Sequence, residues 1–152
     1  MAFIDYERVA KNFEFIKLYQ EGFSILMAEQ HSLATKKDLN LHDIAKTQLI
    51  QRPYCSRSES FQTILKELGI KLSLTAEADN DLQVIELVAL GFGLAAMPSK
   101  RIYPLPKGVI AKPIRDDFKR EIVLAHRSSR LDIKQHIQDI NWDWIYEQLA
   151  SV

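Results

Sequence analysis

Residues 84–99 read VIELVALGFGLAAMPS, and this order of side chains predicts a helix, a tight turn and a strand. Val84 and Val88 lie on one face of the predicted helix. Gly91 suits the end of that helix because glycine tolerates the left-handed backbone of a C-cap, and Gly93 opens the apolar strand that follows. A Rossmann phosphate loop runs from strand to helix, the reverse of this order, so we interpret both glycines as structural.

The alternation of helix and strand continues on both sides of this stretch. A helix that ends at Gly69 is indicated by an apolar stripe at helical spacing, formed by Phe61, Ile64, Leu65 and Leu68. The sequence further predicts strands at residues 2–4, 13–19, 23–28, 47–51, 70–78, 109–114 and 120–127, a short helix at 41–46 capped by Asn40, and a long amphipathic helix at 132–149. Alternating β-α-β units of this kind predict an α/β fold with a doubly wound mixed sheet.

The composition is typical of a folded protein that does not itself bind nucleic acid. The chain has 152 residues, of which 47% are hydrophobic, enough to build a core. Twenty Lys and Arg balance twenty Asp and Glu, so the formal net charge is zero, whereas a nucleic-acid-binding chain usually has a basic surface. The sequence has no apolar run long enough to span a membrane and no signal peptide. We therefore expect a cytoplasmic protein with no membrane partner.

The sequence shows no catalytic or metal-binding pattern. Its histidines are scattered, and no metalloprotease, nucleophile-elbow or P-loop spacing is present. The single cysteine, Cys55, excludes an internal disulfide and a thiolate-rich zinc site. We therefore expect a protein that is not an enzyme and has neither a cofactor nor a metal ion.

A candidate binding site lies in residues 54–60, YCSRSES, between a predicted strand and the helix that ends at Gly69. Free backbone N–H groups and the positive end of the helix dipole point toward such a position, which makes it a ready anion site. Donors are added there by Ser56, Arg57, Ser58 and Ser60. The alternative is that one serine caps the helix and Arg57 is solvated.

Cys55 allows two interpretations. A lone cysteine is usually a small buried hydrophobic residue, but a cysteine beside an arginine at a helix start can be reactive. Because the chain has no second cysteine, any disulfide would be intermolecular.

Three stretches together resemble the effector-binding domain of LysR-type transcriptional regulators. These are LYQEGFSILMAEQHSLA at 18–34, LNLHDIAKTQLIQR at 39–52 and VIELVALGFGLAAMPS at 84–99, and their order and spacing match the family. The resemblance implies the type 2 periplasmic-binding-protein fold, in which two lobes hold a small effector that is often anionic. It also implies a regulator that forms dimers or tetramers and does not catalyse a reaction.

The resemblance assigns regions and residues to that function. It implies one complete lobe at residues 24–119 and part of another at residues 1–23 and 120–152. It places Cys55, Ser56, Arg57, Ser58 and Ser60 at the effector pocket, the segment already reached from helix-end chemistry, and adds Phe92, Gly93 and Ile4. Peroxide-sensing members have a reactive cysteine near this loop, where Cys55 falls, but their partner cysteine has no counterpart here.

The resemblance also leads us to expect a chain truncated at its N-terminus. The winged helix-turn-helix and the start of the first lobe have no counterpart in the 152 residues, so we expect DNA to be bound only through the missing domain and not by this chain alone. A solute-binding module of the same fold, not linked to transcription, is the alternative function. An enzyme of this fold would need a convergent catalytic set, and the sequence offers none.

Overall fold

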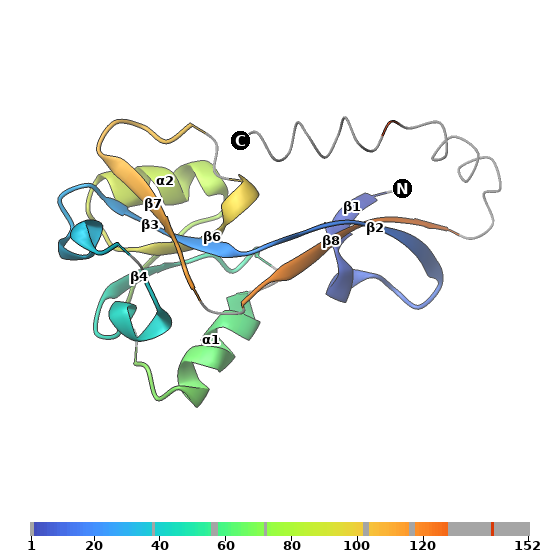
Figure 1. Cartoon of the computed structure of the whole chain (residues 1–152), viewed down its shortest axis with the longest axis horizontal. Coiled ribbons are helices and arrows are strands. Elements are labelled where there is room, and N and C mark those ends of the chain that lie inside the picture. Colours follow the sequence, from blue (N-terminus) through green and yellow to red (C-terminus); the bar gives the residue numbers. More distant parts are fainter. Residues whose placement is uncertain are drawn as a thin grey trace. The chain divides into compact units, whose positions relative to one another are not determined.

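The computed structural model describes residues 2–37, 39–55, 58–71, 73–101, 104–115, 118–127 and residue 141 (Figure 1). The chain divides into two compact units, residues 1–21 with 119–152 and residues 22–118. The lobe boundaries predicted at 23/24 and 119/120 lie next to these divisions. The predicted helix at 132–149, with Trp142 and Trp144, falls outside the described residues.

The unit of residues 22–118 is built on a mixed sheet. Strand β3 (Phe23–Ala28) pairs antiparallel with β6 (Ala95–Pro98) on one side and β7 (Val109–Pro113) on the other. Strand β4 (Gln48–Gln51) pairs parallel with β5 (Ser73–Glu77), and a parallel bridge between Leu49 and Leu94 joins β4 to β6. The resulting strand order is β5-β4-β6-β3-β7, with β5 at an edge.

Two helices cover opposite faces of this sheet, with α2 above it and α1 below it in Figure 1. Helix α1 (Ser58–Glu67) contributes Phe61 and Leu65 to one core, and helix α2 (Asp81–Ala89) contributes Val84 and Val88 to the other. Successive strand residues point to opposite faces. Ile25 therefore lies in the α1 core and Leu26 in the α2 core, so the prediction of a doubly wound mixed sheet is confirmed.

The C-terminal ends predicted for both helices are confirmed in this unit. Asn80 caps α2, since its Oδ1 accepts a hydrogen bond from the Gln83 backbone N–H at 3.0 Å. Gly69 and Gly91 follow α1 and α2 with φ of 69° and 79°, the left-handed conformation expected at a C-cap.

Two predictions of local structure need correction. The predicted helix at 41–46 is a single 3-10 turn, Leu41–Ile44, closed by a capping box between Asn40 and Asp43. Only three residues separate its end from β4, which leaves no length for an α-helix. The strand at 70–78 was predicted from its alternation, but its observed part, β5, is mostly exposed because it lies at the sheet edge.

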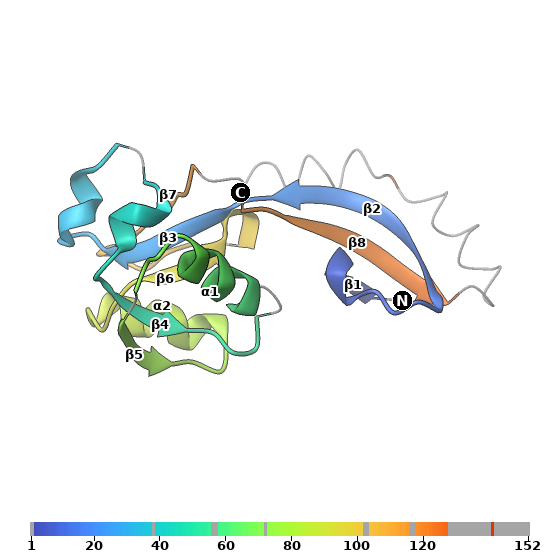
Figure 2. The same ribbon diagram turned by 90° about the horizontal axis from the view of Figure 1, so that it is seen from below.

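The other unit contains a three-stranded antiparallel sheet. Strand β8 (Arg120–Arg127) lies between β1 (Ala2–Asp5) and β2 (Phe13–Glu21), and Figure 2 shows β2 and β8 as a long curved ribbon. The register of β2 against β8 shifts between Lys17 and Tyr19. At this bulge Ile16, Leu18 and Tyr19 pack with Ile122 and Leu124 in a small core.

Strand β1 was expected to be buried, but Ala2 is exposed and Ile4 is half-buried.

In the described part of the chain, no helix is long and apolar enough to cross a membrane.

Candidate functional site

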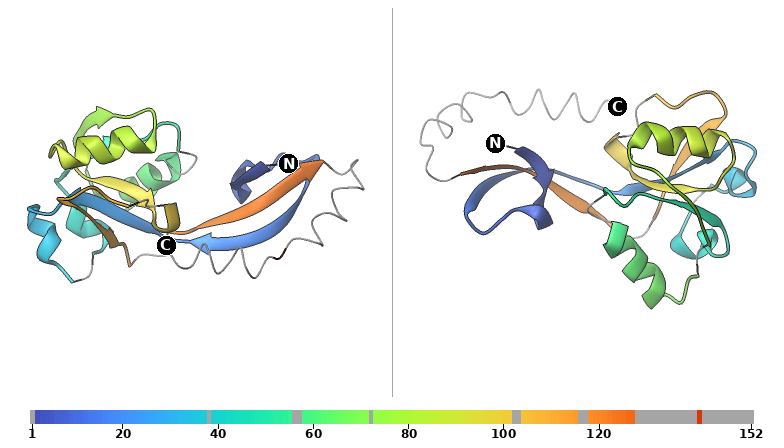
Figure 3. Two further views of the ribbon diagram at one scale, coloured as in Figure 1. Left: turned by 90° about the horizontal axis from the view of Figure 1, so that it is seen from above. Right: turned by 180° about the vertical axis from the view of Figure 1, so that it is seen from behind.

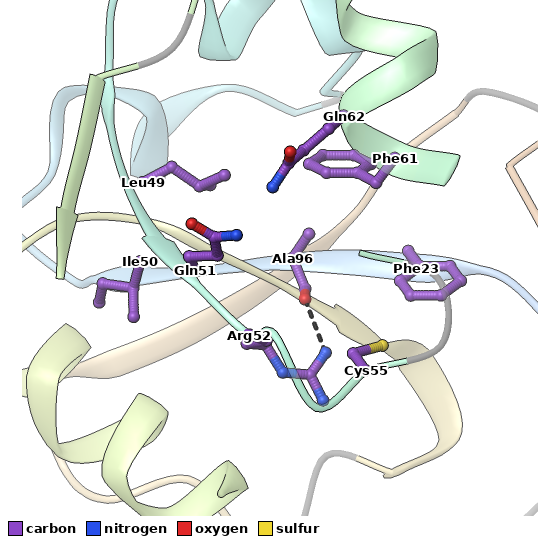
Figure 4. Close-up of a pocket in the computed structure, with 9 residues that line it drawn as sticks. All are labelled: Phe23, Leu49, Ile50, Gln51, Arg52, Cys55, Phe61, Gln62 and Ala96. Atoms are coloured by element: carbon purple, nitrogen blue, oxygen red, sulfur yellow. Dashed lines mark hydrogen bonds between the residues drawn. The ribbon is translucent and has the colours of Figure 1, made fainter. Parts of the chain in front are cut away.

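A recess opens at the carboxyl end of β4, within the unit of residues 22–118. Ligands of open α/β sheets bind outside the carboxyl ends of strands, so this position is favourable for a site. The described residues that line the recess come from β3, β4, α1, β6 and the loop after β4, and are Phe23, Leu49, Ile50, Gln51, Arg52, Cys55, Phe61, Gln62 and Ala96 (Figure 4).

The apolar wall of the recess is rigidly packed. Phe23 and Phe61 are both buried, and both contact Phe118, with ring centroids 4.5 Å and 5.4 Å away. Tilted aromatic pairs at such separations add to the stability that burial supplies. The wall is therefore preformed rather than assembled by a ligand.

Polar groups enter the recess from two elements. Figure 4 shows the amide groups of Gln51, from β4, and Gln62, from α1, beside the apolar wall. A side-chain amide both donates and accepts hydrogen bonds, so these two residues suit a carboxylate, a hydroxyl or an amide. Cys55 adds its thiol from the loop after β4.

Arg52 also borders the recess and is almost fully buried, with 7% of its surface exposed. Its Nη1 donates to the backbone oxygen of Ala96 at 2.9 Å, its Nη2 to Oδ1 of Asp81 at 2.6 Å, and its Nε to the hydroxyl of Tyr54 at 3.1 Å. Each guanidinium nitrogen therefore has a protein partner, as a buried charge requires.

Tyr54 closes this group of residues by donating its hydroxyl proton to Oδ1 of Asp81 at 2.5 Å. Burial, followed by the hydrogen bond to Asp81, raises the pKa of Tyr54 to about 12, because the neighbouring carboxylate disfavours a phenolate. The pKa of Arg52 also lies above its ordinary value: burial lowers it, but Tyr54, Cys55 and Asp81 together raise it further. We call Arg52, Tyr54 and Asp81 the Arg52 cluster.

Of the residues predicted for the site, Cys55 lines the recess and is half-buried. Ser58 begins α1, and Ser60 lies in its first turn and is half-buried. Ser56, Arg57 and the side chain of Ser58 lie outside the described residues. Of the predicted segment, the structure therefore describes Cys55 and the first turn of α1.

The structure does not bring Phe92 and Gly93 to this recess. The backbone oxygen of Phe92 accepts a hydrogen bond from Oγ1 of Thr75 at 2.8 Å, and a Cβ at Gly93 would lie 2.7 Å from the backbone oxygen of Gln48. Gln48 begins β4 whereas Gln51 ends it, so this turn lies roughly 10 Å along the strand from the recess. Ile4 belongs to β1, in the other unit.

Sequence reasoning missed Arg52, Gln51 and Gln62. The sequence could have indicated two of these residues. Gln51 ends a buried strand of a doubly wound sheet and Arg52 follows it, and ligands bind at the carboxyl ends of such strands. Gln62 neighbours the apolar stripe of α1 and could be placed only once α1 was packed on β4. The sequence predicted Arg57 as the arginine of the site instead, because Arg57 lies between two serines at the start of a helix.

The recess is small, with a volume of about 30 Å³. This volume holds roughly one water molecule. The described residues can therefore accept one small group of a ligand, such as a carboxylate or a hydroxyl, rather than a whole metabolite. Among the described residues, no group of three or more His, Cys, Asp or Glu could hold a metal ion.

A family model described as the LysR substrate binding domain matches residues 1–136, most of the chain. The chain belongs to the LysR substrate binding domain family. The family predicted from the three sequence stretches is thereby confirmed. A search of curated proteins found no match.

Several solved structures share the fold, two of them described as effector binding domains. The effector binding domain of QuiR in complex with shikimate is 22% identical, with a TM-score of 0.72 over 84% of this chain and 62% of that chain. The BenM effector binding domain with its effector benzoate is 17% identical, with a TM-score of 0.70 over 98% and 67%. A C206 mutant of OxyR from Corynebacterium glutamicum is 21% identical, with a TM-score of 0.75 over 98% and 47%.

At these identities the likeness establishes the fold, which is α/β and similar to type 2 periplasmic-binding proteins. The LysR substrate binding domain described here spans less than two thirds of the QuiR and OxyR chains.

Proposed function

We propose that this LysR substrate binding domain is the effector-sensing module of a transcriptional regulator and binds a small anionic ligand without catalysis. The observation that carries the proposal is the recess at the carboxyl end of β4, where Gln51, Gln62 and Cys55 meet a preformed aromatic wall. We further propose that the module acts in the cytoplasm, and that DNA is bound by another domain of the regulator.

The expected ligand is a carboxylate. A carboxylate fits a small recess with amide donors, and the start of α1 adds the positive end of a helix dipole. QuiR and BenM were solved with shikimate and benzoate, and both ligands are carboxylates. In the proposed site, Ser56, Arg57, Ser58 and Ser60 supply further donors to the same anion.

A thermal-shift screen of the whole chain against benzoate, shikimate, sulfate and phosphate tests the proposal. A ligand at 100 times its Kd stabilises the native state by about 2.7 kcal/mol, which raises the Tm of a domain of this size by roughly 5 °C or more. Gln62→Ala and Arg57→Ala should each reduce the shift.

Arg8→Ala is the matched control for Arg57→Ala, because Arg8 is an exposed arginine of the other unit. An equal shift in Arg57→Ala and Arg8→Ala removes Arg57 from the site. If none of the four anions raises the Tm, the proposed anion specificity is wrong.

We also propose that the module associates with a second copy of itself. A groove of about 280 Å³ lies between α1 and the edge strand β5, and is lined by Leu49, Gln62, Leu65, Lys66, Gly69, Ile70, Lys71 and Leu74. Beside it, Leu68 is 44% exposed, and within it Leu74 is 51% exposed. Large exposed apolar side chains around a groove are typical of an association surface.

Leu74→Glu tests this surface, because a carboxylate in the groove opposes burial against another apolar surface. The expected result in sedimentation is a shift of the oligomer toward monomer. Leu82→Glu is the control, since Leu82 is 73% exposed on α2, away from the groove. Equal oligomer stability in both variants would exclude the groove as the interface.

A further inference from the structure

Arg52 joins four parts of the unit of residues 22–118. Its backbone directly follows β4, and its side chain reaches β6 through the Ala96 oxygen, the start of α2 through Asp81, and the following loop through Tyr54. The guanidinium carbon also lies 5.2 Å from the centroid of the Tyr54 ring, within the range of a cation–π contact. These contacts surround a side chain that is 7% exposed.

The same residue shapes the loop that carries Cys55. The backbone N–H of Cys55 donates to the backbone oxygen of Arg52 at 3.0 Å, which closes a four-residue turn. Pro53 occupies the second position of this turn, where its restricted φ is favourable. The backbone of Arg52 therefore holds Cys55 directly. The side chain of Arg52 holds Tyr54, the residue next to Cys55 in the same turn.

The side chain of Arg52 is committed to protein partners rather than to a ligand. Three of its nitrogens bond Tyr54, Ala96 and Asp81, and the carboxylate of Asp81 offsets its charge. Asp81 is also the first residue of α2, where a negative charge favours the helix dipole. A ligand that took Arg52 would leave Asp81 and the Ala96 oxygen without these bonds.

We propose that the Arg52 cluster is a positioning device, which fixes the turn of residues 52–55 to the start of α2 and so sets how often Cys55 opens to solvent. The role in ligand binding rests on the proposed function, because the positioned turn forms one wall of the candidate effector recess. The positioning itself requires no ligand. Arg52 thus acts on the site through Tyr54 and Cys55 and does not touch the effector.

Cys55 provides a direct measurement, since it is the only cysteine of the chain. The rate at which Ellman's reagent labels the native protein reports how often the turn opens. Arg52→Met removes all three side-chain bonds while keeping an unbranched side chain. We expect labelling of Cys55 to accelerate tenfold or more, because losing about 1.4 kcal/mol from a local equilibrium changes it tenfold.

Arg120→Met is the matched control, because Arg120 is an equally buried arginine of the other unit and pairs with Glu21. Both variants are labelled at a temperature where circular dichroism shows them folded. The proposal is overturned if Arg52→Met labels at the wild-type rate, or if Arg120→Met accelerates labelling to the same extent, since general loosening would then explain the effect.

Tyr54→Phe keeps the test decisive if Arg52→Met does not fold. It removes only the hydroxyl that links Arg52 to Asp81, and we expect labelling roughly threefold faster, a smaller effect because two of the three bonds to Arg52 remain. Tyr6→Phe, at a 44% exposed tyrosine of the other unit, is its control. An unchanged rate in Tyr54→Phe contradicts the proposal.

The anion screen separates this proposal from the proposed function. If no anion stabilises the wild type but Arg52→Met labels faster, the positioning role stands and the ligand assignment fails. If an anion stabilises the wild type and Arg52→Met equally, and labelling is unchanged, the ligand assignment stands and the positioning role fails.

Discussion

Among the described residues, each of the two units, whose ribbons Figure 3 shows, buries one arginine, and the two arginines are bonded in different ways. Arg120 donates a hydrogen bond from Nε to Oε1 of Glu21 at 2.7 Å, and its Nη2 lies 2.6 Å from the same oxygen as part of the ion pair. Glu21 is the register partner of Arg120 on the neighbouring strand. Arg52 divides its nitrogens among Tyr54, Ala96 and Asp81, which belong to a loop, a strand and a helix.

This difference predicts different consequences when the bonds of each arginine are removed. The pair of Glu21 and Arg120 lies within one antiparallel ladder, which already holds the two strands together, so its removal changes the energy of that ladder. The bonds of Arg52 join elements that no common ladder connects. Their removal should therefore change the position of the recess wall as well as the free energy of unfolding.

Arg120→Met should have the largest effect on stability. The side chain of Glu21 is 0% exposed, so the variant leaves a carboxylate buried without its main partner. Breaking a buried ion pair in this way costs about 3–5 kcal/mol of the free energy of unfolding. Urea denaturation measures the loss, and Glu21→Gln with Arg120→Met should recover part of it. A loss below 1 kcal/mol would show that the pair is not desolvated.

Arg52→Met should cost less, about 2–4 kcal/mol, although it breaks more bonds. The reason is that the side chain of Asp81 is 24% exposed and can regain water when Arg52 is removed. The same denaturation experiment ranks the two variants. A larger loss for Arg52→Met than for Arg120→Met would mean that the number of joined elements matters more than the burial of the carboxylate.

Tyr54→Phe should cost about 0.5–1.5 kcal/mol of the free energy of unfolding at neutral pH, the usual range for one hydrogen bond.

The pH dependence of this loss tests the hydrogen bond more specifically. The pKa of Tyr54 is raised to about 12 in the folded chain, above the ordinary value of 10. The stability that Tyr54 contributes is therefore complete below pH 10 and is lost as the pH rises toward 12. The difference in stability between wild type and Tyr54→Phe should shrink over that interval, and a constant difference would contradict the assigned hydrogen bond.

Lys17→Met measures the stability that an exposed ion pair contributes, for comparison with the two buried arginines. Lys17 pairs with Glu121 at 3.1 Å across β2 and β8, but the side chain of Lys17 is 65% exposed. An exposed ion pair contributes about 0–1 kcal/mol, and salt weakens it further. We expect a loss at the low end of this range that disappears in 1 M salt. A loss comparable to that of Arg120→Met would show that burial does not explain the larger effects.

Local patterns in the sequence were sufficient for much of the fold. Apolar spacing predicted α1 and α2, and the glycines that end them have the expected positive φ. The continuous apolar run at residues 23–28 predicted a buried strand, and the structure places a core on each face of β3. These features depend on residues a few positions apart, so a linear sequence contains them.

The site was predicted only in part. Of the residues predicted together, Cys55 lines the recess, whereas the turn of Phe92 and Gly93 lies at the other end of β4, and the role of each in ligand binding stays a prediction. Periodicity assigns a residue to a face of a strand or a helix. It does not say at which end of a neighbouring strand a turn will lie, because that depends on strand order and direction.

The sequence by itself determined the apolar faces that pack and the glycines that end both helices, since these follow from short-range spacing, and its resemblance to known regulators indicated the family. Only the tertiary structure decided that Arg52 is the buried cation beside the recess. Its partners Asp81 and Ala96 are 29 and 44 residues away along the chain. A guanidinium can be buried only where such distant acceptors converge on it, and packing of β4 against β6 and α2 is what brings them together.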